Sequence, residues 1–371
     1  MFDLFTYQQY WWFLVALLGG LFALMSFVQG GQTLLNTLAK DEDEKSIVIG
    51  SLGRKWELTF TTLVMFGGAL FAAFPLLYAV SFGGAYFVWM IILFCFIVQA
   101  VSYEYRLKPN NFLGQKTYEA FLYINGTLGV TLIGIALGTF FTGGNFVKNE
   151  MNLSSWVEPT YGLEAVMNPF NVALGLTMLF LSRTLASLYF INNIEHKAII
   201  GRAKSALKFD GLLFVGFFLL TAVMLLLLSG VEYSAEGFSV VEYKFLHNLL
   251  EMPLLIVSLL IGVALLLLSL YITLFKDSDG GIWFGGAGAV IAVTSILSLI
   301  GFNNTAIYPS LADLQSSLSI ENSSGSLYTL EVMSLVSLAI PAVLTYIYFV
   351  WKSMDQEKIT ADEILSDSHR Y

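Results

Sequence analysis

A few polar residues stand at the ends or in the middle of long apolar stretches, where they could move protons or form ion pairs. Glu57 opens one stretch directly after Trp56. A carboxylate at a helix start can take up a proton while the helix dipole stabilises its charged form. Gln29 and Gln32 are three residues apart and so share one helix face. These residues predict a proton path, the alternative for Glu57 being an ordinary helix-start carboxylate.

Three charged residues are candidates for structural or partner contacts, together with Trp56. Glu104 and Arg106 close an apolar stretch but are two residues apart, on different helix faces, so separate boundary charges are the alternative to a direct pair. Arg183 lies midway along another stretch and does not deprotonate, so it must meet a carboxylate, carbonyls, lipid phosphate or a partner subunit. Three further acids are expected to be helix-start carboxylates and nothing more: Glu119, Glu251 and Glu331.

Nine apolar stretches of about 20 residues must position these side chains, and each is long enough to cross a bilayer as a helix. They lie near 10–34, 58–80, 82–102, 119–142, 169–192, 211–229, 251–275, 282–302 and 328–351. Unpaired backbone amides are costly in hydrocarbon, so stretches of this length favour helices over barrel strands. The sequence predicts an all-α polytopic membrane protein with one transmembrane domain over 1–351 and a tail over 352–371.

Composition and charge agree with a lipid solvent, since 57% of the 371 residues are hydrophobic and 12% are charged. The longest loops, about 143–168, 230–250 and 303–327, have room for short helices and little more. Fifteen of the 18 Lys and Arg residues lie on one side of the spans. The positive-inside rule therefore places the N-terminus outside and the C-terminal tail in the cytoplasm. The acidic run at 40–45 is expected to be a solvated loop, and no feature predicts a nucleic-acid partner.

Residues that hold cofactors are scarce. Cys95 is the only cysteine, His196 and His247 lie near span ends, and His369 lies in the tail. No two histidines have the helical i, i+4 spacing of a metal pair, and no phosphate-binding loop is present. The sequence predicts no metal site, no cofactor bound by this chain alone and no catalytic residue.

The order of these residues resembles subunit II of cytochrome bd-type quinol oxidases, including the cyanide-insensitive branch. The likeness runs over nearly the whole chain and depends on five segments: WWFLVALLGGLFALMSFVQGG at 11–31, KWELTFTTLVMFGGALFAAFPLLYA at 55–79, YEYRLK at 103–108, MNPF at 167–170 and LSIENSSGSLYTLEVM at 318–333. The polar run Asn322, Ser323 and Ser324 has no general role before a membrane span, so it joins the candidates for structural or partner contacts.

The resemblance implies a heterodimer in the bacterial cytoplasmic (inner) membrane. In that family, subunit I carries haem b, haem d and the quinol site, and subunit II is a similarly folded partner without haem ligands. The complex oxidises quinol, takes protons from the cytoplasm and reduces dioxygen to water, which generates a proton gradient. The family also suggests a structural quinone or lipid in this subunit and a small single-span third subunit.

By the same resemblance, Glu57 matches an acidic residue after Trp that is attributed to a proton path. The family usually has DGFDLG near the inner end of the first span, whereas this chain has QGGQTL at 29–34. Because an amide does not exchange a proton at ordinary pH, a path through Gln29 and Gln32 is either abandoned or rebuilt with water. A proton or dioxygen route through this subunit is thus an expectation, with Glu57 as the remaining acid.

A secondary transporter is the alternative from another class. Arg183 and the buried amides would then bind a small solute at the membrane midplane. Such folds often have paired interrupted helices in their two halves, but Pro253 and Pro341 form no symmetric pair.

Overall fold

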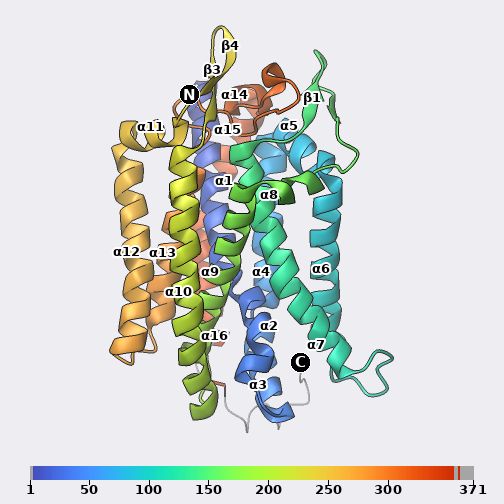
Figure 1. Ribbon diagram of the computed structural model, residues 1–371, viewed down its shortest axis with the longest axis vertical. Helices are drawn as coiled ribbons and strands as arrows, with labels where there is room; N and C mark the ends of the chain where they lie inside the picture. The colour runs from blue at the N-terminus through green and yellow to red at the C-terminus, as the bar shows by residue number, and fades with distance from the viewer. Residues whose placement is uncertain (1–2, 355–357, 360–371) are drawn as a thin grey trace.

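The structure is a computed structural model that describes residues 3–354 and 358–359, and its long helices stand side by side in one bundle (Figure 1). The N-terminus and two β-hairpins lie at one end, called the hairpin end. The loops that carry most of the Lys and Arg residues lie at the opposite end, called the basic end. The predicted all-α polytopic membrane fold is confirmed.

The helices follow one another with few strands between them. The bundle contains α1 (Leu4–Met25), α2 (Phe27–Leu38), α3 (Glu42–Gly53), α4 (Trp56–Ala73), α5 (Pro75–Tyr78), α6 (Tyr86–Tyr105), α7 (Gln115–Ile124), α8 (Val130–Thr142), α9 (Pro169–Asn193), α10 (Lys197–Leu227), α11 (Lys244–Glu251), α12 (Pro253–Phe275), α13 (Gly281–Leu297), α14 (Ile320–Ser323), α15 (Leu327–Ser337) and α16 (Ile340–Met354). Two π-helical turns, η1 (Ala79–Gly84) and η2 (Asn125–Gly129), and two 3-10 turns, η3 (Leu163–Met167) and η4 (Leu314–Ser316), complete the set.

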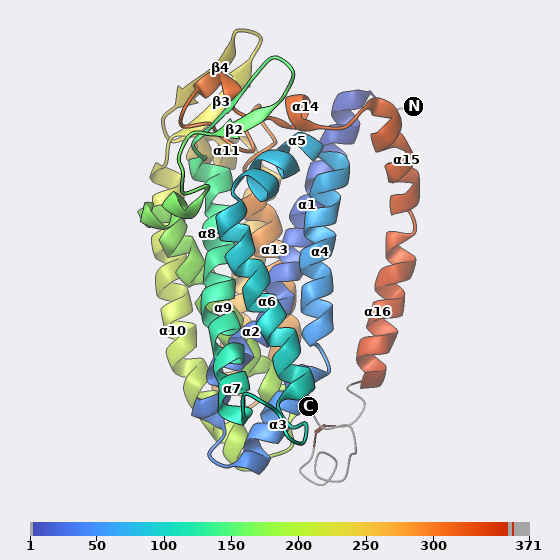
Figure 2. The ribbon, with the colours of Figure 1, turned by 90° about the vertical axis from the view of Figure 1, so that its right-hand side faces the viewer.

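Within the described residues, seven helical segments are long and apolar enough to cross a membrane. Two shorter apolar helices, Gly281–Leu297 and Leu327–Ala342, stand where the eighth and ninth spans are predicted. Figure 2 shows the last of these, α15 with α16, at the edge of the bundle beside α1 and α4. The number nine and the sidedness of the chain stay predictions.

Irregular turns interrupt the first and fourth predicted spans. Ser26 separates α1 from α2, and its hydroxyl donates to the carbonyl of Ala23 at 2.7 Å. A serine that bonds back to its own helix bends it. The π-helical turn η2 separates α7 from α8 and inserts an extra residue into the turn. Both interruptions lie beside polar side chains that point into the bundle.

Two glycines let α2 approach its neighbours closely. A Cβ on Gly30 would lie 2.2 Å from the backbone carbonyl of Ser182 on α9. A Cβ on Gly126, in η2, would lie 2.3 Å from the backbone oxygen of Gln29. Neither position accepts a larger residue, so α2 is held against α9 on one side and against η2 on the other.

Two antiparallel hairpins cover the hairpin end (Figure 1). Strand β1 (Phe146–Lys148) pairs with β2 (Ser154–Trp156), and β3 (Gly230–Ser234) pairs with β4 (Gly237–Val241), in a register that places Val231 opposite Val240. They occupy two of the predicted long loops, which therefore contain strands as well as short helices.

The prediction of a solvated loop at 40–45 is wrong from residue 42 onward. Helix α3 begins at Glu42, and the carboxylate of Asp41 caps it by accepting from the Glu44 amide at 2.8 Å. Acidic residues in a first turn stabilise the positive end of the helix dipole. Glu44 is buried and bonds Arg202 of α10. Three acids in sequence therefore start a helix here and do not form a loop.

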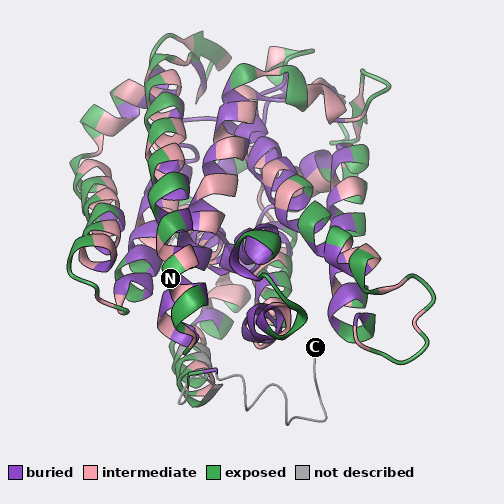
Figure 3. Cartoon of the chain, turned by 60° about the horizontal axis from the view of Figure 1, so that its bottom comes forward, coloured by how far each residue is buried: buried purple, intermediate pink, exposed green. Residues whose placement is uncertain are grey.

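The predicted tail is described only in part, and residues 355–357 and 360–371 lie outside the described residues. Ile359 is buried and pairs with Ile194, accepting from Glu195 N at 3.0 Å and donating to Asn193 O at 2.9 Å. This short segment of the tail packs against the end of α9. Figure 3 shows the burial across the bundle, with exposed residues on the outward sides of the peripheral helices.

Candidate functional site

Four side-chain amides from three elements meet inside the half of the bundle that lies toward the basic end. Gln29 and Gln32 of α2 donate through Nε2 to Oε1 of Gln99 on α6, at 2.8 and 2.6 Å. Asn125, the first residue of η2, donates to the same oxygen and to Gln32 Oε1 at 3.2 Å. All four side chains are buried. The shared face predicted for Gln29 and Gln32 thus points to one acceptor.

This amide cluster keeps hydrogen-bonding capacity free. Three donors converge on Gln99 Oε1, while Gln29 Oε1, Gln99 Nε2 and Asn125 Oδ1 are buried without a partner among the described residues. A buried polar atom without a partner costs about 1–3 kcal/mol. Amides donate and accept but do not lose a proton at ordinary pH. The cluster can therefore orient polar groups but cannot itself carry a proton.

Two aromatic rings adjoin the amide cluster, and the second belongs to Trp56, the residue before Glu57. Gln32 Nε2 donates to the Tyr103 hydroxyl at 3.2 Å, and the Tyr103 ring stacks on Trp56 with centroids 5.6 Å apart and planes 12° from parallel. Glu57 is exposed on the outward side of α4, and its carboxylate has no hydrogen-bond partner within the described residues. The structure thus brings Trp56 to the cluster and leaves Glu57 outside it.

Arg183 forms an ion pair within the bundle. Its Nε donates to Asp210 Oδ1 on α10 at 2.8 Å, and its guanidinium also donates to the Thr33 hydroxyl of α2 at 2.6 Å. Asp210 is fully buried. The carboxylate that Arg183 requires is therefore Asp210, which sequence reasoning missed because it lies one residue before the predicted span 211–229. Helix α10 begins 13 residues earlier, at Lys197, which places Asp210 well inside the helix.

Arg106 is the centre of a second ionic group, at the basic end. It is fully buried and donates to Glu119 through Nε at 3.1 Å and through Nη2 at 2.9 Å, and Nη2 also reaches Glu42 at 3.0 Å. Lys45 binds the other oxygen of Glu119 at 2.9 Å. The prediction that Glu119 is a helix-start carboxylate and nothing more is wrong, because a buried guanidinium needs a buried partner.

Glu104 lies apart from that group. Its exposed carboxylate pairs with Lys108 at 3.2 Å, one helical turn along. The expectation that Glu104 and Arg106 occupy different faces therefore agrees with the contacts of both residues. An exposed pair of this kind contributes little to stability.

The polar run 322–324 lies at the hairpin end, far along the bundle from the amide cluster (Figure 1). Asn322 and Ser319 form a capping box at the start of α14, and Ser323 donates to the Ser319 carbonyl. Gln8 of α1 donates to the Ser324 hydroxyl at 2.7 Å. Within the described residues these side chains therefore join the loop before α15 to the start of α1.

Among the described residues, no group of three or more His, Cys, Asp or Glu side chains could hold a metal ion. His196 caps α10 by accepting from the Ile199 amide at 3.4 Å, close to Glu44, and so lies at the basic end of the bundle. His247 belongs to the short helix α11 at the hairpin end. Neither histidine lies in the interior, where an axial haem ligand would be needed.

A family model described as cytochrome bd terminal oxidase subunit II matches residues 7–354. The chain belongs to this family. It is 24% identical to cytochrome bd-I ubiquinol oxidase subunit 2 of Escherichia coli, over 97% of both chains. It is 26% identical to cytochrome bd ubiquinol oxidase subunit 2 of Bacillus subtilis, over 94% of this chain and 96% of that one. A probable cytochrome oxidase subunit 2 of Haemophilus influenzae is 25% identical over 92% of both.

The fold agrees with this family. A chain of the bd oxidase from Geobacillus thermodenitrificans superposes with a TM-score of 0.65 at 14% identity, covering 94% of this chain and 98% of that one. The predicted resemblance is therefore confirmed, and this cytochrome bd subunit II is a multi-pass protein of the bacterial inner membrane within a quinol oxidase complex. Membership of this family removes the basis for the transporter alternative.

Proposed function

We propose that this subunit docks the haem-bearing subunit I on the outward face of α4, and that Glu57 at the start of that face takes protons from the cytoplasm and passes them toward the partner. The observation that carries the proposal is the position of Glu57. It is an exposed carboxylate at the basic end, and it follows Trp56, whose ring stacks on Tyr103 inside the bundle.

The outward face of α4 has the composition of a helix-packing surface. Its exposed residues include Glu57, Thr61 and Gly68, together with the apolar side chains of Phe60, Val64, Met65 and Phe71. Small and polar residues are enriched where membrane helices pack, and a carboxylate is costly against lipid. A Cβ on Gly68 would meet nothing within 4 Å, so the packing of this chain does not require a glycine there. A glycine at this position would let a helix of a neighbouring subunit approach α4 closely.

The amide cluster supports an outward direction for the protons. Gln29, Gln32, Gln99 and Asn125 fill the interior behind Trp56 with groups that do not titrate. A proton held by Glu57 therefore finds no carboxylate among the four residues of this cluster. In this proposal Gln29 and Gln32 carry no proton, and Gln32 orients Tyr103 through its hydrogen bond to the phenol. The alternative is a proton route through water molecules beside Gln29 and Gln32.

The haems belong to the partner in this proposal, where they supply the reduction of dioxygen. The described part of this chain offers no interior histidine and no metal-binding group. Its residues contribute a surface that holds the partner and a carboxylate that exchanges protons at the membrane boundary. A small single-span subunit and the choice of quinol are predictions that these contacts do not address.

An apolar cavity of about 130 Å³ supports the predicted structural quinone or lipid. It lies between α9, α10, α12 and α13 and is lined by Leu181, Phe214, Leu266 and Ala292 among other apolar side chains. Its two hydroxyls, Thr177 and Thr221, bond each other at 2.9 Å and so present little polarity. An alkyl or isoprenoid chain suits such a lining, and dioxygen, which is also apolar, would be able to enter it.

The test is Glu57→Gln in the purified oxidase complex. We expect quinol-dependent oxygen consumption to fall by about tenfold or more, because a positioned acid–base group contributes roughly 10²–10⁴-fold where proton transfer limits the rate. Glu57→Asp should restore most of the turnover by keeping a carboxylate. Glu195→Gln, an exposed acid at the same end, is the matched control. Equal turnover in the Glu57→Gln and Glu195→Gln complexes, at equal haem content, would remove Glu57 from the path.

A further inference from the structure

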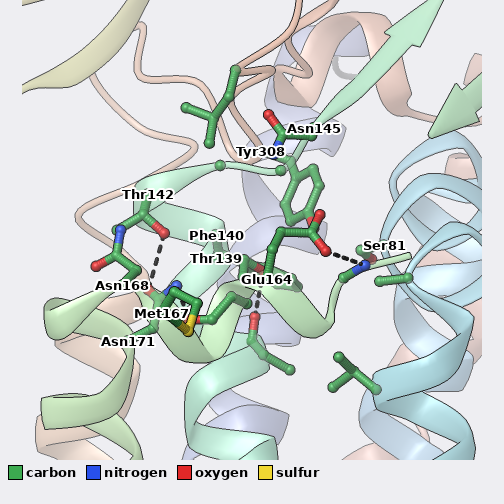
Figure 4. A pocket seen from close by; sticks show the side chains of 18 of the residues that line it. Ser81, Thr139, Phe140, Thr142, Asn145, Glu164, Met167, Asn168, Asn171 and Tyr308 are labelled. Atoms are coloured by element: carbon green, nitrogen blue, oxygen red, sulfur yellow. Dashed lines mark hydrogen bonds between the residues drawn. The ribbon is translucent and has the colours of Figure 1, made fainter. Parts of the chain in front are cut away.

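A cavity of about 390 Å³ lies at the hairpin end, remote from the amide cluster and from Glu57. The start of α6, the end of α8, the turn η3 and the start of α9 line it, together with Trp156 of β2. Figure 4 shows Glu164 and Tyr308 at its wall. Its volume falls within the range of about 300–1,000 Å³ that is usual for small-molecule sites. It is large enough for the head group of a lipid or a metabolite of similar size.

One carboxylate is fixed at its wall. Glu164 Oε2 accepts from the Thr160 hydroxyl at 2.6 Å and from the Gly162 amide at 3.0 Å. Gly162 has φ +93°, and a Cβ there would lie 2.6 Å from the Ala85 side chain, so only glycine lets this turn approach α6. The other oxygen, Oε1, is buried and has no partner among the described residues. The turn therefore presents a rigid acceptor with an unused oxygen.

The rest of the lining is formally neutral and combines aromatic rings with hydroxyl and amide side chains, among them Thr139 and Asn145. Trp89, Phe140, Trp156 and Tyr308 contribute to the wall, and Glu164 is the only formally charged residue among the described residues that line the cavity. Trp89 donates to the Ser81 carbonyl at 3.1 Å and Trp156 donates to the Val80 carbonyl at 3.0 Å. Both indole rings are thus held in place. Burial raises the pKa of the Tyr308 phenol.

A carboxylate beside aromatic rings is a recognition chemistry suited to an ammonium group. A protonated amine donates charge-assisted hydrogen bonds to a carboxylate oxygen and is attracted to ring faces. An anionic ligand would meet Glu164 without any cation in the lining to balance it. A purely apolar ligand would leave Glu164 Oε1 buried and unpaired, at a cost.

We propose that this cavity binds a primary ammonium group, with Glu164 Oε1 as its acceptor and the rings of Trp89, Phe140, Trp156 and Tyr308 as its walls. The amine belongs either to the head group of an aminophospholipid or to a small soluble amine. Exposed apolar side chains at the rim, Met167 at 81% and Leu311 at 61% exposure, suit the contact with lipid. The site does not depend on the proton path of Glu57.

The experiment uses the intact oxidase complex and two probes. Native mass spectrometry counts phosphatidylethanolamine retained after extraction from nanodiscs of phosphatidylethanolamine and phosphatidylglycerol. Calorimetric titration with ethanolamine hydrochloride, against sodium chloride of equal ionic strength, measures the soluble amine. Retention of the lipid alone assigns the amine to a lipid head group, and binding of ethanolamine alone assigns it to a soluble source. Binding in neither arm overturns the proposal.

Three variants locate the site. Glu164→Gln keeps an oxygen for Thr160 and Gly162 but loses the charge, and we expect about a tenfold or greater loss of amine binding, the effect of one charge-assisted hydrogen bond. Glu158→Gln, an exposed acid in the same loop, should bind as the wild type does. Ala165→Leu fills the cavity and keeps the carboxylate, so it should also abolish binding. Undiminished binding in either Glu164→Gln or Ala165→Leu, with normal haem content, would place the amine elsewhere and overturn the proposal.

Discussion

Helices α4 and α12 both lie at the periphery, yet their outward faces differ in kind. Every exposed residue of α12 is apolar or Tyr: Pro253, Leu254, Val257, Leu260, Ile261, Ala264, Leu267, Leu268, Tyr271 and Phe275. The outward face of α4 combines aromatic and aliphatic side chains with Glu57, Thr61 and Gly68. Exposure alone therefore does not say what covers a membrane helix. The α12 face suits lipid, and the α4 face suits another protein.

The largest expected effect comes from filling the α4 face. Gly68→Trp adds a side chain into open space in this chain, so the subunit itself should fold. The bulk would prevent a partner from packing there, and we expect the haem subunit to be lost from the purified complex. The matched variant on α12 is Leu260→Trp, which should leave the complex intact. Affinity purification through this subunit, followed by the visible spectrum of the eluate, measures both. Equal haem absorbance in the two variants would contradict the assignment of α4 to the partner.

A smaller loss, of stability and not of docking, should follow from Arg183→Ala. Removing the guanidinium leaves Asp210 buried without its counter-charge, and breaking one partner of a buried pair costs roughly 3–5 kcal/mol. The double variant Arg183→Met with Asp210→Leu should recover most of that stability because no charge is left alone. Thermal unfolding followed by circular dichroism measures the stability of the single and the double variant against the wild type. The haem content of every variant that folds should stay normal, because this ion pair lies inside the bundle and not on the α4 face. A single variant as stable as the wild type would disprove the expected cost of breaking the pair.

The smallest expected effect is a loss of stability on removing the ion pair of Asp279, in the loop after α12. Lys358 donates to Asp279 at 2.7 Å, and this bond holds the pKa of the Asp279 carboxyl below its usual value. A lowered pKa means that the contact contributes above the ordinary pKa of Asp and is lost as the pH falls through the lowered value. Asp279→Asn should therefore destabilise the protein by less than about 1 kcal/mol at pH 7. The difference in melting temperature from the wild type should vanish in strong acid. A difference that persists there would assign it to another cause.

The approximate positions of seven spans could be predicted because hydrophobic length is a local property of the sequence. The shared face of Gln29 and Gln32 follows in the same way from helical spacing. Their acceptor Gln99 and their neighbour Asn125 come from segments about 70 and 100 residues away, and only tertiary packing joins them. The sequence did mark Gln99 and Asn125 as candidates for interior contacts, because both are amides within predicted spans, where polar side chains are uncommon.

The ionic groups were harder to predict because charges near span ends look alike in sequence. Glu57 and Glu119 both follow an apparent helix start, yet one is exposed and the other lies against a buried guanidinium. The decisive fact was that Arg106 is buried, and burial depends on how α3, α6 and α7 meet. The acidic run at 40–45 was misassigned for the same reason, because Arg202, which Glu44 bonds, lies on a distant helix.

The π-helical turn η2 sets the rotation of the whole segment before it. Removing one residue from 125–129 would restore regular α-helical winding and turn α7 by about 100° relative to α8. Glu119 would then swing away from Arg106 and Lys45, and Asn125 would leave the other amides. The extra residue in η2 thus sets the rotation of α7 relative to α8. With that rotation, Glu119 reaches its cations while Asn125, more than one helical turn away, still reaches the amides of Gln32 and Gln99.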